Sequence, residues 1–387
     1  LFALPDAATQ SNRFEIAIPG LASLYLTHDW NGEIRGIQDF AGQHPPVAPV
    51  FWAFRVMVGV GLLMVSSLAM GCSLVVYDGI LCRIATPDER DRISSRGWAW
   101  GYVGGAILLA VNLALLTLHG SVGITTGMAV RICLLSAGLW WGLFTLIPVL
   151  GLRGLPTRSL EEVAPSAATP TGAIAGAFGQ LADTFRELRM LPQTMLFLLA
   201  YLFYNDGIQT VISQSSIYGS GELDMGQSQV LMTFLLVQII AFFGALIFGR
   251  AAASWGASRT VLVGIVIWLG VVLVAVFVPK GNFGMFLLLG SMIGLVMGGT
   301  QALSRSLYSK LVPRGRESEF FSLYQAMERG TSWLGTLTFG VVFQLTHSYR
   351  YAIVALIVFF LVGGALLSRV KFREGIEAAG NQVPRKI

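Results

Sequence analysis

The chain alternates long apolar segments with short polar or glycine-rich ones. The first apolar run, residues 51–82, reads "FWAFRVMVGVGLLMVSSLAMGCSLVVYDGILC" and contains only two charged residues, Arg55 and Asp78. As an α-helix rising ~1.5 Å per residue, a run of this length would measure roughly 48 Å, whereas the hydrocarbon core of a bilayer is about 30 Å thick. We therefore expect this helix either to tilt strongly or to break near Gly71.

Eight further apolar segments follow, and each has about the 20 residues that one membrane crossing needs. They cover residues 97–118, 129–150, 194–213, 228–248, 260–278, 283–303, 321–345 and 351–367. With the first run they predict an all-α membrane protein of about nine transmembrane helices. Residues 1–46 are mixed in polarity and contain no spanning segment.

Composition supports a membrane protein and excludes several other classes. Hydrophobic residues make up 54% of the 387 and charged residues 12%, against about 25% charged in soluble chains. The net charge of +5 does not predict nucleic-acid binding, because basic residues beside apolar segments set membrane orientation. The three cysteines have no metal-ligand spacing, and we expect no metal and no cofactor.

Catalytic motifs are also missing from the sequence. The four histidines lie outside the central parts of the apolar segments, and there is neither a phosphate-binding Walker loop nor a nucleophile elbow. An enzyme or an ATP-driven pump is therefore not expected. A secondary transporter remains, and its substrate site would lie near the membrane midplane.

Basic residues predict the orientation of the chain. One set of connecting segments, together with the C-terminal tail, holds 19 Lys and Arg, and the alternate set after the first span holds only Lys280 and Arg350. Because cytoplasmic loops carry the excess of Lys and Arg, the C-terminus is expected in the cytoplasm. Nine spans then place the small N-terminal segment outside the cell membrane.

The longest connecting segment, residues 153–193, divides the array into three spans and six. Its first part, "EEVAPSAATPTG", has the composition of a linker. Its second part places apolar residues at alternating spacings of four and three, which predicts one apolar helical stripe on the membrane surface or against helix ends. The stripe consists of Ile174, Phe178, Leu181, Phe185 and Leu188.

Two local patterns concern helix ends and helix packing. Thr86, Pro87 and Glu89 fit a capping box and predict that a short charged helix begins there. Pairs of glycines one turn apart, which allow close helix approach, occur at the start of the second span and in the seventh. They are Gly101 and Gly105, and then Gly290, Gly294 and Gly298.

A polar group inside the fourth span is the main candidate for a transport path. Asn205, Asp206 and Gln209 share one helical face within "FLLAYLFYNDGIQTVIS". An acid at that depth is costly and usually faces a bundle interior or a water-filled path. The alternative is a structural hydrogen-bond cluster between helices. Further path candidates, for which a structural role is equally expected, are Gln238, Gln301, Glu328, Arg329 and Asn112.

From about residue 72 to 370 the sequence resembles a family of major facilitator transporters that includes the vacuole effluxers linked to autophagy and their bacterial relatives. The segments that carry this resemblance are "IATPDERDRISSRGWAWGYVGG", "YNDGIQTVI", "LLVQIIAFFGALIFGR", "GGTQALSRSLYSKLVP", "EFFSLYQAMERGTSWLG" and "SYRYAIVALIVFF". The resemblance implies helices four to twelve of a twelve-helix transporter, that is, a truncated major-facilitator bundle. Residues 71–152 would form part of the N-terminal half, 153–193 the linker, 194–370 the C-terminal half and 371–387 a cytoplasmic tail.

Residues 1–70 resemble a second family, subunit I of the cytochrome bd quinol oxidases. The matching segments are "FEIAIPGLASLYLTHDWNGEIRGIQDF" and "PPVAPVFWAFRVMVGVGLLM". This resemblance implies that Met57 would be an axial ligand of haem b with Arg55 as its partner, although the partner histidines and the glutamate-bearing helices of the oxidase are missing. The overlong first helix would then join an oxidase helix to a transporter helix near residues 69–72.

These features together predict a permease of the bacterial inner membrane that moves small organic solutes by alternating access. By resemblance, its substrates would include amino acids and its direction would be export. Asp206 is the candidate proton-coupling acid, with Asn205 and Gln209 beside it. The alternatives are an oxidase-like electron-transfer fragment and a non-functional fusion. The expected partners are the lipid bilayer, a small solute and protons, and no nucleic acid.

Overall fold

The computed structural model describes residues 2–6, 11–16, 23, 28–33, 47–121, 123–151, 179, 183–329 and 333–387. The chain divides into two compact units, Leu1–Ser73 and Leu74–Ile387. Each unit is described by itself, and the functional residues discussed below belong to the second.

The first unit contains a hairpin and the beginning of a long helix. Strands β1 (Phe2–Asp6) and β2 (Ser11–Ile16) pair antiparallel, a feature that the mixed polarity of this segment did not predict. Helix α2 (Val47–Ile84) has 38 residues and continues without interruption through Gly71. The expected alternative of a break near Gly71 is therefore wrong. One glycine costs a helix only about 1 kcal/mol, and no proline follows Pro49 within α2 to interrupt its hydrogen bonds.

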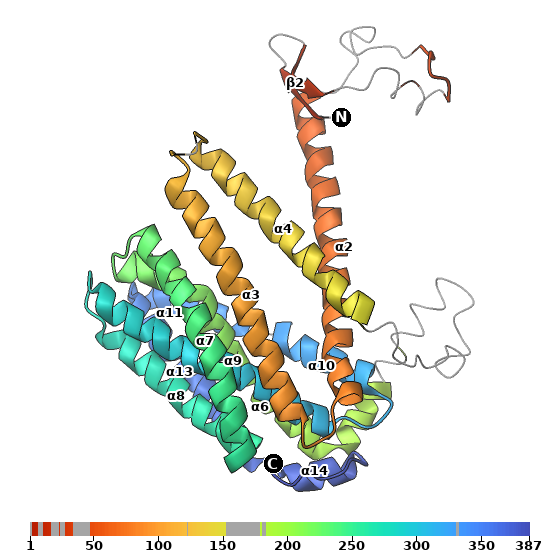
Figure 1. Ribbon diagram of the computed structural model, residues 1–387, viewed down its shortest axis with the longest axis vertical. Coiled ribbons are helices and arrows are strands. Elements are labelled where there is room, and N and C mark those ends of the chain that lie inside the picture. Colours follow the sequence, from red (N-terminus) through yellow and green to blue (C-terminus); the bar gives the residue numbers. More distant parts are fainter. Residues whose placement is uncertain are drawn as a thin grey trace. The chain divides into compact units, whose positions relative to one another are not determined.

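All regular elements in the described part of the second unit are helices (Figure 1). After α2, its elements are α3 (Arg90–Leu118), α4 (Thr126–Gly151), α6 (Pro192–Ile217), the π-helical turn η3 (Tyr218–Glu222), α7 (Gln227–Trp255), α8 (Ala257–Phe277), α9 (Phe283–Leu311), α10 (Glu317–Arg329), α11 (Trp333–Thr346), α12 (Tyr349–Ala355), α13 (Ile357–Arg369) and α14 (Phe372–Ala378). Glycines with positive φ form several of the turns, because only glycine enters that region without steric cost. These are Gly256, Gly281 and Gly315, at φ values of 93°, 73° and 87°.

Seven helical segments in the described part are long and apolar enough to cross a membrane. They correspond to α3, α4, α6 with η3, α7, α8, α9, and α12 with α13. The expected count of nine is not confirmed. Residues 321–345, expected as one span, are divided between α10 with 13 residues and α11 with 14, and each is shorter than a full crossing.

Glycines bring α7 and α9 into backbone contact, as the sequence predicted. A Cβ placed on Gly294 would lie 2.7 Å from the carbonyl oxygen of Val237, and one on Gly298 would lie 3.0 Å from that of Ala241. From the other side, Gly244 of α7 rests on the backbone of Leu295. Helix α3 also packs along both α7 and α9. Its two glycines differ, because a Cβ added to Gly105 would lie 2.5 Å from Gln238 Nε2, whereas one added to Gly101 would meet no other segment within 4 Å.

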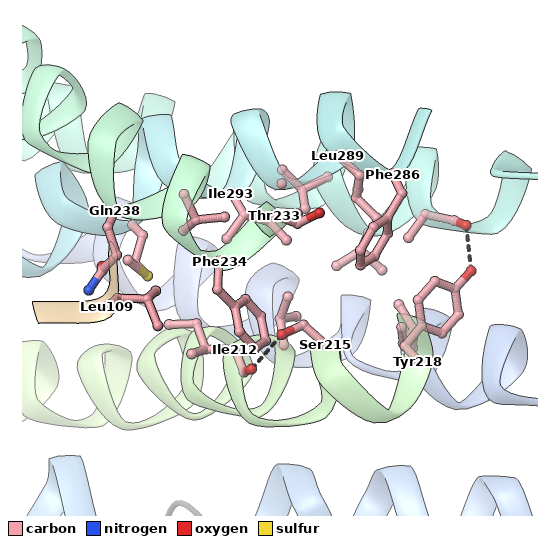
Figure 2. A pocket seen from close by; sticks show the side chains of 18 residues that line it. Leu109, Ile212, Ser215, Tyr218, Thr233, Phe234, Gln238, Phe286, Leu289 and Ile293 are labelled. Atoms are coloured by element: carbon pink, nitrogen blue, oxygen red, sulfur yellow. Dashed lines mark hydrogen bonds between the residues drawn. The ribbon is translucent and has the colours of Figure 1, made fainter. Parts of the chain in front are cut away.

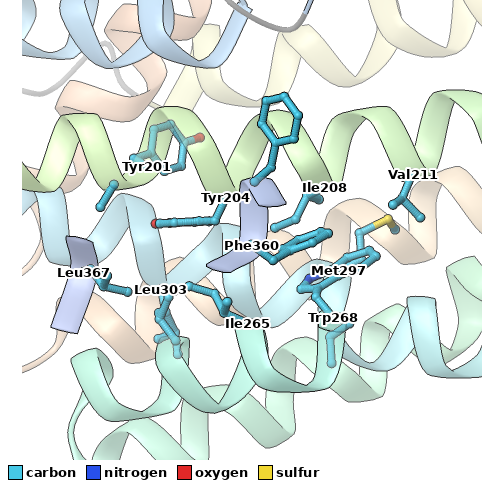
Figure 3. Close-up of a cluster of buried hydrophobic side chains, with 14 of the residues drawn as sticks. Tyr201, Tyr204, Ile208, Val211, Ile265, Trp268, Met297, Leu303, Phe360 and Leu367 are labelled. Carbon is cyan, nitrogen blue, oxygen red and sulfur yellow. The ribbon is translucent and has the colours of Figure 1, made fainter. Parts of the chain in front are cut away.

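Aromatic side chains fill the space between α6, α8, α9 and α13 (Figure 3). The rings of Trp268 and Phe360 stack with centroids 5.8 Å apart, and Gly207 of α6 leaves room for the Phe360 ring. The hydroxyl of Tyr204 donates to Ser304 Oγ at 2.7 Å. This well-packed layer fixes α6 against the C-terminal helices.

The predicted linker helix and capping box are each observed in part. Residues 183–190 are helical, with Leu188 buried and Phe185 44% exposed, whereas Ile174, Phe178 and Leu181 lie outside the described residues. The Glu89 carboxylate accepts from the hydroxyl of Thr86 at 2.7 Å and from its backbone N–H at 3.4 Å. The hydroxyl bond holds the pKa of Glu89 below its usual value. The charged segment that follows is the beginning of α3 and not a separate short helix.

Candidate functional site

The second unit has two ends with different chemistry. We call the end where α3 begins, where α7 and α9 finish and where α14 lies the basic end (Figure 1). The opposite end, where α7 and α9 begin, is called the pocket end. Helices α3, α7 and α9 extend between the two.

The pocket end contains a cavity of about 350 Å³ (Figure 2). Its wall is formed by α3, α6, η3, α7, α8, α9 and α12, through one to five residues from each. Apolar side chains such as Leu109, Ile212, Phe234, Leu289 and Ile293 make up most of this wall. Because one wall residue comes from α3 and the others lie after the linker, the cavity is bounded by both parts of the bundle.

Four polar side chains line this pocket. Three of them direct their hydroxyl hydrogens to backbone carbonyls: Ser215 to Ile212 at 2.7 Å, Tyr218 to Ala275 at 2.6 Å and Thr233 to Gln229 at 2.8 Å. The fourth is Gln238. A Cβ on Gly105 of α3 would lie 2.5 Å from its Nε2 atom, so the Gln238 amide lies directly against that helix.

An ion pair holds the pocket end together beside this cavity. The Arg350 guanidinium donates to Glu222 at 2.9 Å and to the carbonyls of Val276 and Val278 at 2.9 and 3.0 Å. It thereby ties η3 and the end of α8 to α12. These carbonyls lie at the C-terminal end of α8, where a cation stabilises the helix because it pairs with carbonyls that the helix itself leaves unpaired.

At the basic end, a buried ion pair joins α3 to α9. The Lys310 ammonium donates to both carboxylate oxygens of Asp91 at 2.9 Å, and the Lys310 side chain is only 1% exposed. Ser306, one turn earlier on α9, donates to the same carboxylate at 2.6 Å. Each charge therefore has a close partner, which a buried charge requires.

A second buried pair joins α2 to α9 and α10. Arg305 donates to Asp78 at 3.1 Å and to Ser94 Oγ through two nitrogens at 3.0 and 3.2 Å. Gln325 of α10 donates to the other Asp78 oxygen at 2.7 Å. The guanidinium also lies over the ring of Tyr77, 5.0 Å from its centroid. Asp78 stood out in the sequence as an acid in an apolar run, but its partner could not be identified there.

Further contacts at the basic end involve backbone carbonyls and the C-terminal segment. Arg90 donates to the Ser309 carbonyl at 2.8 Å. In the tail, the Arg385 amide donates to Asp88 at 2.8 Å and Lys386 to the Ser254 carbonyl at 3.0 Å. The tail therefore contacts both the α2–α3 turn and the end of α7.

The structure places the predicted group on α6 between the two ends and outside the pocket wall. Asp206 accepts from the backbone N–H of Gly335 at 2.7 Å, near the start of α11. Its other oxygen, both polar atoms of Asn205 and the hydroxyl of Thr210 are buried, and none of them has a hydrogen-bond partner among the residues that the structure describes. Gln209 is half-buried. Asp206 thus has an identified helix-capping contact, and its coupling role stays a prediction.

The other predicted residues are distributed across the unit, and among them only Gln238 lines the pocket. Glu328 accepts from the Tyr201 hydroxyl at 3.0 Å, and Arg329 donates to Gln325 at 3.3 Å, beside Asp78. Asn112 accepts from Ser136 at 3.0 Å between α3 and α4. Gln301 is buried on α9.

The haem-ligand prediction falls in the first unit. The Met57 side chain is 62% exposed, and the side chain of Arg55 lies outside the described residues. Haem ligation by Met57, with Arg55 as its partner, stays a prediction.

Comparison with known proteins supports the transporter resemblance. The chain is 32% identical over 309 residues to the MFS-type transporter YxiO of Bacillus subtilis, covering 79% of this chain and 69% of that protein. It is 29% identical over 319 residues to autophagy-related protein 22 of Saccharomyces cerevisiae, covering 72% of this chain and 58% of that protein. The chain therefore spans little more than half the length of the fungal relative.

A solved structure shows a similar fold. It is a bacterial homologue of the iron transporter ferroportin in an outward-facing state, with a TM-score of 0.51, 16% identity, and coverage of 88% of this chain and 77% of that one. At this identity the likeness concerns the fold alone.

The family match extends across most of the chain. A sequence profile described as "Vacuole effluxer Atg22 like" matches residues 50–380. The match begins inside the segment that resembled cytochrome bd, and none of these comparisons supports an oxidase fragment. The relatives are transporters and not enzymes. The chain is therefore a multi-pass membrane protein that belongs to the vacuole effluxer Atg22-like family of MFS-type transporters.

Proposed function

We propose that this chain is a secondary transporter that exports small organic solutes by alternating access. The observation that carries the proposal is the difference between the two ends of the second unit. One end holds a cavity of about 350 Å³, and the other is closed by the buried pairs Asp91–Lys310 and Asp78–Arg305.

The closure joins helices that lie on opposite sides of the linker in the sequence. Asp78 and Asp91 belong to α2 and α3, whereas Arg305 and Lys310 belong to α9. A solute could reach the pocket from the basic end only if these pairs separated. Separation exposes four charges to water, so hydration offsets part of the lost attraction. Such ion pairs are therefore suited to a contact between helices that breaks and re-forms during each transport cycle.

The basic end would face the cytoplasm, because most of the Lys and Arg outside the spans lie in the segments on that side. The arrangement would then correspond to a state open to the outside, which is also the state of the ferroportin homologue with the similar fold. Export from a bacterial cell would begin after the basic end opens. Free amino acids are the narrower expectation from the resemblance.

Cysteine accessibility tests this proposal. After Cys72, Cys82 and Cys133 are replaced by serine, Ser215→Cys places a thiol in the pocket wall and Ser309→Cys places one in the buried part of α9. A membrane-impermeant thiol reagent added outside intact cells should label Ser215→Cys and not Ser309→Cys. In inside-out vesicles, Ser309→Cys should be labelled slowly.

Removing the Asp91–Lys310 ion pair should change the two labelling rates in opposite directions. When Asp91→Asn and Lys310→Met are introduced together, Ser309→Cys should be labelled faster in inside-out vesicles, and Ser215→Cys should be labelled more slowly from outside cells. Labelling of Ser309→Cys from outside would reverse the proposed orientation. Rates that do not respond to the paired change would contradict alternating access and favour a non-functional fusion that merely folds in the membrane.

A further inference from the structure

Two exposed arginines lie at the basic end of the contact between α3 and α7, on the side that faces away from α9. We propose that Arg96 and Arg250 bind the headgroup of one anionic phospholipid, whose acyl chains lie along these two helices. The lipid holds α3 and α7 together on their membrane side and thereby favours the closed basic end. This last effect rests on the proposed function, whereas the binding itself does not.

The two arginines occupy equivalent positions on antiparallel helices. Helix α3 begins at the basic end and α7 finishes there, so the two chain segments run in opposite directions. A Cβ on Gly249 of α7 would lie 2.8 Å from the Cβ of Ser95 of α3, so these two residues face each other. Arg96 and Arg250 each come one residue later, which is a rotation of about 100° around the helix. Because the helices are antiparallel, both rotations turn toward the same side of the contact.

The residues on the other side of the contact show which side this is. The residue before each contact position is buried against α9. Ser94 donates to the Ala302 carbonyl of α9 at 2.6 Å, and the Phe248 ring lies directly on Gly299 of the same helix. The two arginines are exposed, so they lie on the opposite side, which is directed toward lipid.

The charges of this pair call for an anion at the level of the lipid headgroups. Neither guanidinium has a hydrogen-bond or ion-pair partner in the part of the chain that the structure describes. Arg96 directly precedes the apolar segment 97–118, and Arg250 follows the segment 228–248 by two residues, so both mark the membrane boundary. Two cations beside one helix contact repel each other, and an anion between them removes this repulsion. A guanidinium can donate two parallel hydrogen bonds to a phosphate group.

Apolar side chains continue along the same surface toward the middle of the membrane. Trp100, which is 69% exposed, lies one turn beyond Arg96, and its ring contacts that of Phe242 on α7 with centroids 6.3 Å apart. Phe243 is exposed two turns before Arg250. Acyl chains would cover this surface, whereas a free phosphate ion or an acidic peptide at the arginines would not. The combination therefore favours a phospholipid over other anions.

A lipid at this position connects the two parts of the bundle. Helix α3 lies before the linker and α7 after it, and α7 is held to α9 through backbone contacts. Opening the basic end separates α3 from α9 and therefore also from α7. A lipid bound to both arginines would have to release one of them during this movement. Because it binds the closed arrangement better, it shifts the equilibrium toward that arrangement.

Native mass spectrometry of the purified, delipidated protein tests the binding. The first phosphatidylglycerol should bind more tightly than phosphatidylcholine, which has no net charge. Arg96→Gln and Arg250→Gln together should weaken phosphatidylglycerol binding about 20-fold, because one basic residue near an anionic headgroup contributes about fivefold. The matched control is Arg259→Gln with Arg369→Gln, which removes two exposed arginines at the same end, but from α8 and α13. This control should leave the affinity unchanged.

The labelling rate of Ser309→Cys, with the three native cysteines replaced by serine, tests the effect on the closed end. In nanodiscs of phosphatidylglycerol, the protein with Arg96→Gln and Arg250→Gln should be labelled several-fold faster than the control variant. In nanodiscs of phosphatidylcholine, the two proteins should be labelled at the same rate. Comparing variants within one kind of nanodisc removes any effect of lipid charge on the reagent.

Three outcomes would overturn the inference. An equal loss of affinity in the control variant would show that the arginines act only through the general positive charge of this end. Phosphatidylcholine binding as tightly as phosphatidylglycerol would contradict the role of the headgroup charge. Loss of binding with no change in the labelling rate would contradict the effect on closure. The proposed function fails on a different result, namely labelling rates that do not respond to removal of the Asp91–Lys310 ion pair.

Discussion

The pocket end and the basic end are built largely from the same helices, yet their polar groups are used differently. At the pocket end, three hydroxyls donate to carbonyls of their own helix or of a neighbouring one, and none of the described residues that line the cavity is Asp, Glu, Lys, Arg or His. At the basic end, four ionisable side chains are buried in two pairs that connect different helices. The comparison indicates that one end is suited to an occupant and the other to a reversible closure.

The contact between α7 and α9 lies between these two regions and differs from both. Here the helices meet through backbone and glycine. A contact of this kind tolerates little change in distance, because added volume meets main-chain atoms that cannot rotate away. We therefore expect α7 and α9 to move together when the basic end opens.

The largest effect is expected from breaking one pair at the basic end. Lys310→Met leaves the Asp91 carboxylate buried without its cation, and removing one partner of a buried pair costs about 3–5 kcal/mol. A denaturant titration of the purified protein should show this loss in the free energy of unfolding. In the double variant Lys310→Met with Asp91→Leu no charge is stranded, and most of the stability should return. If the single and double variants lose the same amount, the pair does not act as a unit.

A smaller effect is expected at the contact between the two ends. A Cβ on Gly244 would meet the carbonyl group of Leu295, and overpacking of this kind costs about 1–3 kcal/mol. Gly270 of α8 is the control, since no atom lies within 4 Å of its Cβ position. Gly270→Ala should be neutral or slightly stabilising, because alanine favours a helix. Thermal unfolding measures both, and equal melting temperatures would contradict the close contact.

The smallest change in stability is expected for Asp206→Asn, although its effect on transport should be large. Asp206→Asn retains an oxygen that can accept from Gly335 N–H, so stability should fall by less than about 1 kcal/mol. If Asp206 couples proton movement to solute movement, liposomes that contain this variant should no longer accumulate solute when a pH gradient is applied. They should still exchange solute across the membrane when no gradient is present. The assay would use labelled leucine, an example of the amino acids that the resemblance predicts as substrates.

Asp206→Leu separates the two roles of this residue. It removes the acceptor and should lower stability by about 1–3 kcal/mol, because the N–H of Gly335 would be left without a partner. Accumulation that survives in Asp206→Asn would leave Asp206 with its helix-capping contact as its only role.

Much of the fold could be predicted from the sequence, because hydropathy and glycine spacing are local. The apolar segments that became α3, α7, α8 and α9 were recognised, and so were the glycines of α9. The division of residues 321–345 into α10 and α11 was not, since that segment has the hydropathy of one continuous span. The continuous α2 was one of two alternatives that its length allowed.

The site was less predictable, because it depends on pairs of residues far apart in the chain. Asp78 and Arg305, or Asp91 and Lys310, are separated by more than 200 positions, and neither pair has a local pattern. Arg305 and Lys310 contributed only to the orientation argument. Gln238 was among the candidates because it is a polar residue within an apolar span, a signal that equally selected Asn112, whose contact joins α3 to α4.

The last part of α9 has a topological consequence. Every residue from Thr300 to Leu311 is buried, so all sides of the helix there are covered by other segments of the chain. A helix at the edge of a bundle keeps one face toward lipid, but this one occupies a central axis at the basic end. Any conformational change that admits solvent to this end must uncover some of these twelve positions. The positions that become exposed would show which side of α9 the neighbouring helices move away from.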